Sequence, residues 1–97
     1  MSYYVYLLIS QNYKKIISYV GYTNDLKKRL QLHNNSKGAK FTRGRKWKLI
    51  YKQSYKSKSF AMKEEYKLKK NYKLRNLIKK IYLNNVWNNS KWSKNFT

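Results

Sequence analysis

Two apolar stretches near the N-terminus are separated by a polar run. Residues 3–10 (YYVYLLIS) and 16–22 (IISYVGY) are rich in aromatic, β-branched and leucine side chains, and a polar run, QNYKK, separates them. Aromatic and β-branched residues favour the half-buried surface of a sheet. We therefore predict two antiparallel strands joined as a hairpin with a five-residue loop.

A helix is expected after the hairpin. Asn24 offers an N-cap and Asp25 a negative charge in the first turn, where the helix dipole favours it, ahead of the run DLKKRLQLHN. Leu26 and Leu30 give this helix a narrow apolar stripe. Residues 34–45 (NNSKGAKFTRGR) contain two of the three glycines and several polar or small residues, which is typical of a loop.

The second half of the chain predicts one more strand and two helices. Residues 47–55 (WKLIYKQSY) alternate well enough for a strand, Ser59 is a candidate N-cap for a helix to about Asn71, and residues 74–82 form a last helix. The order ββαβαα predicts an α+β fold, a small three-stranded antiparallel sheet flanked by helices.

The chain has room for one domain, which we place at residues 1–82. Residues 83–97 (LNNVWNNSKWSKNFT) form an Asn-rich tail that carries Trp87, Trp92 and Phe96. These aromatic side chains could stack on bases or pin the tail to the domain. We favour pinning, because their spacing matches neither a helix nor a strand period.

The charge of the chain is extremely one-sided. It has 24 Lys plus Arg against 3 Asp plus Glu, a formal net charge of +21. Such self-repulsion is relieved by a polyanion, so nucleic acid is the expected partner. A membrane-surface protein would need a long amphipathic helix, which no segment shows cleanly, and solubility alone would need a much smaller imbalance.

Composition excludes several other classes of protein. Hydrophobic residues make up 41% and aromatic residues 18%, which is too apolar for a disordered chain. The absence of Cys excludes disulfides, Cys-based zinc sites and a thiol nucleophile. With no apolar stretch near the ~20 residues of a membrane span and no signal-peptide pattern, we expect no membrane and an intracellular location, cytoplasmic or nucleoid-associated.

Carboxylate chemistry must use one of three residues, Asp25, Glu64 or Glu65. Asp25 is explained as a first-turn residue. At 100° per residue, Glu65 shares a helical face with residues expected to point inward, whereas Glu64 lies to one side. Those inward residues are Ala61, Leu68 and Tyr72.

Two interpretations of an inward-facing Glu65 remain open. It could form an i, i+4 ion pair with Lys69, which contributes ~0.3–0.5 kcal/mol at an exposed site. It could instead bind a divalent ion, because Mg²⁺ is commonly held by one or two carboxylates together with water and phosphate oxygens.

Further candidate residues lie on the first helix and the hairpin. Arg29 and His33 are four residues apart beside the leucine stripe, which places one above the other near the sheet's edge. Tyr4 and Tyr6 share a face of the first strand, and Tyr19 lies within cross-strand reach of Tyr6. A structural histidine and an ordinary tyrosine cluster are the simpler explanations of each feature alone.

Taken in order, the motifs resemble those of the GIY-YIG nuclease superfamily, specifically its standalone single-domain members. The similar segments are Tyr4-Val5-Tyr6, Tyr19-Val20-Gly21, the run 21–26 followed by Arg29 and His33, the loop 37–45, and the helix start 61–66. The resemblance covers residues 3–80. Tyr4 stands where the first motif is named for glycine.

The resemblance implies the GIY-YIG fold and a DNA endonuclease that uses one divalent ion, Mg²⁺ or Mn²⁺, and no small-molecule cofactor. It makes Glu65 the metal ligand and Arg29 the group that stabilises charge on the scissile phosphate. Tyr6 and Tyr19 would flank the attacking water, one of them as general base, and His33 would orient a tyrosine or the phosphate. A phenol has a pKa near ~10, and we expect the surrounding cations to lower it.

The basic loop is the expected DNA-binding element outside this centre. Its cations are Lys37, Lys40, Arg43 and Arg45. The alternative function is a non-catalytic nucleic-acid-binding module on the same fold. The preferred DNA structure, the oligomeric state and the choice among repair, mobile-element and viral roles stay open.

Overall fold

The structure is a computed structural model that describes the backbone of residues 1–12 and 15–96 and the side chains of residues 1–11 and 15–85. The elements run in the predicted order ββαβαα, with one added 3₁₀ turn. They are β1 (Tyr3–Asn12), β2 (Lys15–Thr23), α1 (Leu26–Asn34), η1 (Lys40–Thr42), β3 (Lys48–Tyr55), α2 (Lys58–Lys70) and α3 (Tyr72–Phe96). The α+β prediction is confirmed.

The sheet is antiparallel, with β1 in the centre of the order β2-β1-β3. Tyr6 lies opposite Gly21 of β2 and opposite Lys52 of β3. Leu7 and Leu8 pair with residues 51 and 49, so residue 50 of β3 is the extra residue of a bulge. As the central strand, β1 is buried on both faces, which explains its nearly continuous apolar sequence.

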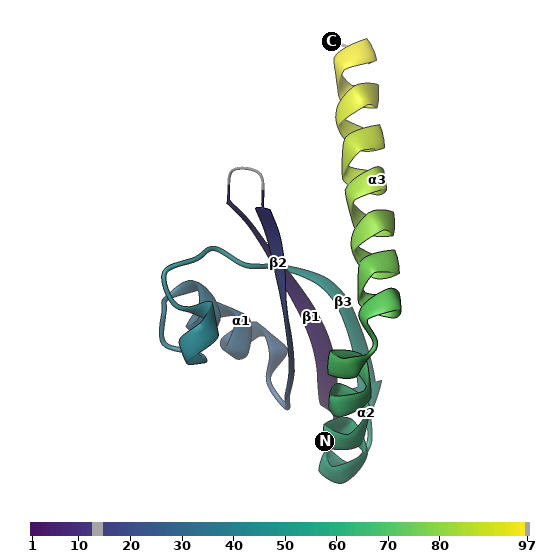
Figure 1. Cartoon of the computed structure of the whole chain (residues 1–97). Helices are drawn as coiled ribbons and strands as arrows, with labels where there is room; N and C mark the ends of the chain where they lie inside the picture. Colours follow the sequence, from purple (N-terminus) through teal and green to yellow (C-terminus); the bar gives the residue numbers. More distant parts are fainter. Residues whose placement is uncertain (13–14, 97) are drawn as a thin grey trace.

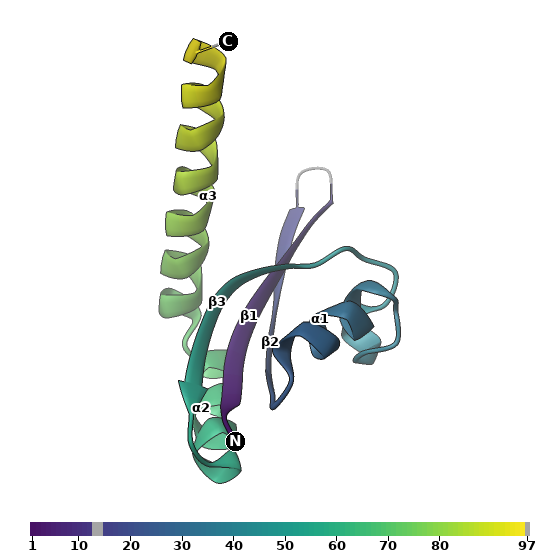
Figure 2. The same ribbon diagram turned by 180° about the vertical axis from the view of Figure 1, so that it is seen from behind.

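Alternation along β1 divides the interior into two clusters, because successive side chains point to opposite faces of the sheet. One cluster, between the sheet and α2, consists of Val5, Leu7, Val20, Ala61 and Leu68. The other, on the α1 side, consists of Tyr6, Leu8 and Trp47, with Leu26 and Leu30 packed against it. Figures 1 and 2 show the sheet between α1 and α2 from both sides.

Both predicted N-caps are wrong by one or two residues. Asp25, and not Asn24, caps α1 by accepting a hydrogen bond of 3.1 Å from the backbone N–H of Lys28. Ser57, and not Ser59, caps α2 and accepts from Phe60 N at 3.2 Å. The N-cap is the residue whose side-chain oxygen accepts from the N–H three positions later. Its position is therefore determined by where the helix actually begins.

The last helix is longer than predicted. α3 runs from Tyr72 to Phe96 instead of residues 74–82, so the residues expected to form a tail continue the helix. The side chains of Trp87, Trp92 and Phe96 lie outside the described residues. α2 ends at Lys70, and Tyr72 therefore belongs to α3 and is 65% exposed rather than on the inward face of α2.

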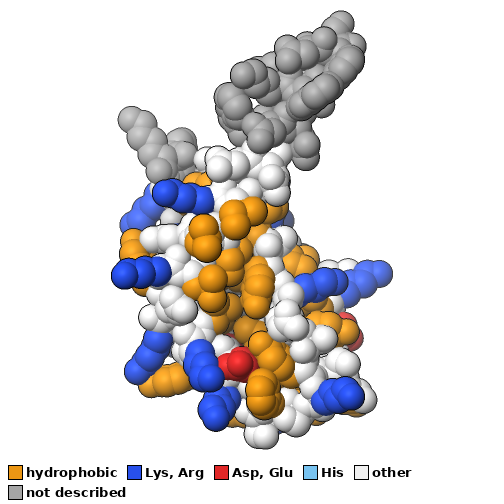
Figure 3. All heavy atoms as spheres, turned by 90° about the vertical axis from the view of Figure 1, so that its right-hand side faces the viewer, with side chains coloured by type: hydrophobic (Ala, Val, Ile, Leu, Met, Phe, Trp, Pro, Cys, Tyr) orange, Lys and Arg blue, Asp and Glu red, His pale blue; other side chains and the backbone are white. Residues whose placement is uncertain are grey.

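The face that carries α2 and α3 is partly apolar. Figure 3 shows hydrophobic side chains gathered there among Lys and Arg. The exposed ones include Tyr66, Tyr72, Leu74, Leu77 and Ile81. No helix in the described part of the chain combines the length and the apolar character needed to span a membrane.

Candidate active site

The centre of the α1 side is a chain of hydrogen bonds between buried side chains. The Tyr6 hydroxyl lies 2.8 Å from Nε2 of His33, and Nδ1 of His33 lies 2.9 Å from Oγ1 of Thr42. Tyr6 is 1% exposed, and His33 and Thr42 are fully buried. His33 therefore lies in the interior, and not at the sheet's edge as predicted.

The partners of Thr42 determine the tautomer of His33. The Thr42 hydroxyl donates its proton to the carbonyl oxygen of Ala39 at 2.9 Å, so its oxygen accepts from His33 Nδ1–H. This leaves Nε2 without a proton, as the acceptor for the Tyr6 O–H. Tyr6 thus donates toward a neutral imidazole that is able to receive its proton.

Two of the three glycines make room for this pair. A Cβ on Gly21 would collide with the hydroxyl end of the Tyr6 ring, and a Cβ on Gly38 would lie 2.5 Å from Nδ1 of His33. The glycine of the second motif is therefore explained by the close approach of Tyr6 across the strand pair.

The loop that covers His33 is anchored by Trp47. Its indole Nε1 donates to the carbonyl oxygen of Thr42 at 2.8 Å, and its backbone N–H donates to Oδ1 of Asn34 at 2.6 Å. Asn34 in turn donates to the Trp47 carbonyl at 3.2 Å. These contacts were not predictable from the sequence, because Thr42 and Asn34 stand in a segment without periodicity; the glycine at position 38 is the one signal that points to them.

Burial dominates the electrostatics of Tyr6. It raises the pKa of the phenol to about 12; the neighbouring Arg29 lowers this pKa, while Tyr19 and Glu65 raise it further. The expectation of a lowered phenol pKa is wrong for Tyr6, because the loss of solvent outweighs the cation. Burial, and then the charge of Arg29, lower the pKa of His33 below its ordinary 6.5. Both shifts keep the pair neutral at pH 7.

This neutrality predicts a specific acid sensitivity. Because the folded state lowers the pKa of His33, the unfolded chain binds the proton first, and the stabilising contribution present above pH 6.5 is lost as the pH falls below it. We expect the urea midpoint to fall between pH 7 and pH 5.5. His33→Gln should be less stable at pH 7 but should lack this part of the pH dependence. An equal acid response in both proteins would contradict the assignment.

Tyr19 joins the pair through its ring. Its centroid lies 6.4 Å from that of Tyr6 and 5.0 Å from that of His33. Tyr19 lies opposite Leu8, and so on the same face of the sheet as Tyr6. The predicted approach of the two tyrosines is present in the structure.

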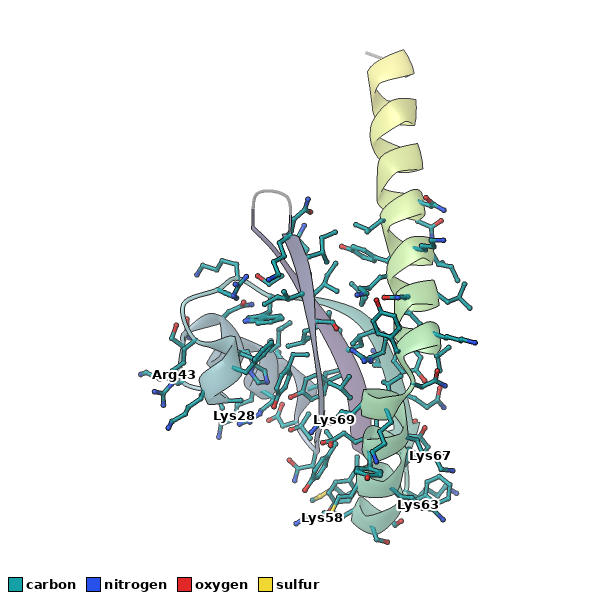
Figure 4. All side chains as sticks on the ribbon, viewed as in Figure 1. Lys28, Arg43, Lys58, Lys63, Lys67 and Lys69 are labelled. Carbon is teal, nitrogen blue, oxygen red and sulfur yellow. The ribbon has the colours of Figure 1, made fainter. Side chains whose placement is uncertain are left out.

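Glu65 lies on α2, on the other side of the sheet from α1, yet its charge acts on Tyr6. Its side chain is 16% exposed and pairs with Lys69 at 3.0 Å. Glu64 is 25% exposed and pairs with Lys67 at 3.4 Å. In Figure 4, Lys69 lies on the side of α2 nearer to α1, and Lys67 on the opposite side.

A metal ion at Glu65 would depend on other oxygens besides those of the protein. In the part of the chain that the structure describes, no three His, Cys, Asp or Glu side chains gather in one place. A single half-buried carboxylate is a hard oxygen donor, and Mg²⁺ is bound in this way when water and substrate phosphate complete its shell. The donor fits the ion, and the same carboxylate is paired with Lys69 in the structure.

The basic loop places most of its predicted DNA-binding residues in solvent. Lys37, Lys40 and Arg43 are exposed. Figure 4 shows Arg43 beside α1, on the opposite side of the molecule from Lys63 and Lys67. Arg45 is only half-buried, and its Nη1 is shielded from solvent without a hydrogen-bond partner among the described residues.

Comparison with known protein families decides the assignment. The model of the GIY-YIG catalytic domain matches residues 2–79, a segment that contains every predicted site residue. The chain belongs to the GIY-YIG family. The resemblance of the short motifs is thereby confirmed over nearly the whole chain.

Several UPF0213 proteins are similar to this GIY-YIG chain. One from Oceanobacillus iheyensis is 46% identical over 67 residues, 68% of this chain and 74% of that one. One from Streptococcus pneumoniae is 53% identical over 53 residues, which is 54% of this chain and 54% of that one. The solution NMR structure of UPF0213 protein BH0048 from Bacillus halodurans is 38% identical, with 81% of this chain and 84% of that chain covered and a TM-score of 0.47.

Proposed function

We propose that this GIY-YIG domain is a DNA endonuclease that hydrolyses phosphodiester bonds with the help of one divalent ion, Mg²⁺ or Mn²⁺. The observation that supports this most is the hydrogen-bonded chain from Tyr6 through His33 to Thr42. A tyrosine held in a core needs one partner for its hydroxyl. A neutral imidazole with a fixed tautomer does more, because it can accept the proton of that hydroxyl.

In the proposed mechanism a water molecule attacks phosphorus while its proton passes to the Tyr6 oxygen, and the Tyr6 proton passes to Nε2 of His33. Thr42 keeps the imidazole oriented through Nδ1. The new P–O bond forms as the bond to the departing DNA oxygen breaks. Arg29, whose charge already acts on Tyr6, would stabilise the additional charge on the phosphate oxygens.

Glu65 would hold the divalent ion. The chemistry that such an ion supplies when bound is Lewis-acid stabilisation of charge on the phosphate and on the leaving oxygen. Lys69 would be released from its pairing with Glu65 and become available to a neighbouring phosphate.

The decisive experiment is a cleavage assay. Supercoiled, branched and single-stranded DNA should be incubated with the protein in Mg²⁺, in Mn²⁺ and in chelator. Cleavage that requires the metal supports an endonuclease. One observation favours a non-catalytic nucleic-acid-binding module instead, namely the ion pair that already neutralises Glu65; retention of DNA without cleavage in either metal would establish that function.

DNA binding should be strongly dependent on salt. Each neutralised phosphate contributes a slope of about −0.9 to the plot of log K against log salt on duplex DNA. We expect Arg43→Ala, in the exposed loop, to reduce the magnitude of the slope by about 1. Lys63→Ala is the matched control, because Lys63 lies on the opposite side in Figure 4. A flat salt response would contradict nucleic-acid binding, and equal effects of both variants would contradict a role for the loop.

A further inference from the structure

The basic loop presents an aromatic side chain that neither the domain's interior nor the proposed chemistry accounts for. Phe41 is 56% exposed, although it stands in η1 directly before the fully buried Thr42. Thr42 is fixed by several hydrogen bonds, among them the one from its hydroxyl to Ala39 and the one from the Trp47 indole to its carbonyl oxygen. The ring is therefore held in solvent by an ordered segment.

Phe41 is the outer member of a series of rings that ends at the candidate catalytic pair. Its ring is stacked on Tyr19, with centroids 6.1 Å apart and planes inclined by 22°. Tyr19 contacts His33 at 5.0 Å and Tyr6 at 6.4 Å. One ring thus separates Phe41 from both members of the pair. A flat exposed aromatic surface of this kind is what proteins use to stack on nucleobases.

The charges around Phe41 suit the backbone on either side of a stacked base. Lys40 precedes it, Arg43 follows two positions later, and both are exposed. Proteins that bind unpaired strands combine such a cationic path for phosphates with aromatic rings for the bases. A base within a duplex is already covered on both faces by its neighbours, so only an unpaired nucleotide offers a face to Phe41.

We propose that Phe41, supported by Tyr19, is a stacking platform for an unpaired base next to the scissile phosphate, which makes the substrate a single-stranded or locally unpaired DNA segment. The proposal rests on the proposed nuclease function and specifies its substrate class. Phe60 provides a matched comparison within the chain. It is 51% exposed and packs on another tyrosine, Tyr55, at 5.3 Å, but it belongs to α2.

The test measures binding in chelator, so that cleavage does not enter. A labelled single strand and its duplex should be titrated with the wild-type chain and with three variants, Phe41→Leu, Phe41→Trp and Phe60→Leu. Phe41→Leu should weaken single-strand binding by about five- to a hundredfold, the range of one base stacked on an aromatic ring. Duplex binding should change less than twofold, Phe41→Trp should retain binding, and Phe60→Leu should resemble the wild type.

An abasic substitution moved along the strand identifies the stacked base. At one position it should weaken binding by the wild type to the same extent as Phe41→Leu, and it should weaken that variant no further. The proposal would be overturned if Phe41→Leu weakened binding to the single strand and to the duplex equally. It would also be overturned if the losses of affinity from the abasic substitution and from Phe41→Leu were additive at every position. If Phe41→Leu selectively weakens single-strand binding but no metal-dependent cleavage is found, only the nuclease function is refuted. If DNA is cleaved but this selective loss of binding is missing, only the stacking platform is refuted.

Discussion

Glu65→Gln should abolish metal-dependent cleavage while DNA binding is preserved or tightened. The change keeps the size of the side chain and removes the charge that would hold the ion. Metal ions stabilise transition-state charge by several kcal/mol, so a rate loss of about 10³-fold or more is expected. Removing one negative charge near the phosphates should in turn favour DNA. Single-turnover cleavage and a parallel binding titration measure both effects.

Glu64→Gln is the matched control, because it makes the same change one residue earlier in α2. Glu64 pairs with Lys67 and lines a surface groove with Tyr51 and Tyr55, so its loss should leave cleavage nearly unchanged. The opposite result, an inactive Glu64→Gln and an active Glu65→Gln, would show that the wrong carboxylate has been chosen.

Tyr6→Phe should produce the second large loss of activity. Removal of a positioned general base costs about 10²–10⁴ in rate. The ring remains in its cluster, but Nε2 of the buried His33 loses its donor, which costs about 1–3 kcal/mol of stability. Unfolding should therefore be measured beside cleavage. Tyr19→Phe is the comparison, and it should lose less activity because its observed contacts are made by the ring.

The pH profile separates a relay through His33 from direct action of a phenolate. Neutral His33 is the proton acceptor in the relay, and its pKa is lowered below 6.5. As the pH is raised, wild-type turnover should therefore increase, reach its plateau by pH 6.5 and stay level to about pH 9. The charged and titratable neighbours that influence the pair are Arg29, Tyr19 and Glu65. A rate that climbs tenfold per pH unit above pH 7 would exclude the relay, and full activity of both phenylalanine variants would exclude both tyrosines.

The fold was largely predictable because the two apolar runs of the hairpin, the alternation of residues 47–55 and the helical face of α2 are each visible in the sequence. The residues at which the helices begin and end were harder to predict. Asn24 and Asp25 are both good capping residues, and so are Ser57 and Ser59, so composition alone does not choose between them. The continuation of α3 through Asn-rich sequence was missed because a weak apolar period does not prevent a helix from extending.

The order of the motifs was sufficient to identify the candidate residues. It did not predict the side chains that surround them or how deeply they are buried. Tyr6 and His33 are 27 positions apart, and nothing in the sequence marks Thr42 as the second partner of the imidazole. The sign of the pKa shift at Tyr6 was also out of reach. An abundance of cations suggested a lowered value, whereas the 1% exposure that decides the shift arises only when α1 and the loop close over the sheet.

The alternation of β1 has a further consequence, because the strand serves two interior clusters at once. Displacing β1 by one residue relative to its partners would exchange the two sets of side chains. Val5 or Leu7 would then face His33, and neither side chain has a hydroxyl to donate to Nε2 of the imidazole. Circular dichroism reports the content of strand and helix and not the register in which the strands pair. For this domain, the hydrogen bond between Tyr6 and His33 is therefore a more faithful report of correct strand pairing than secondary-structure content.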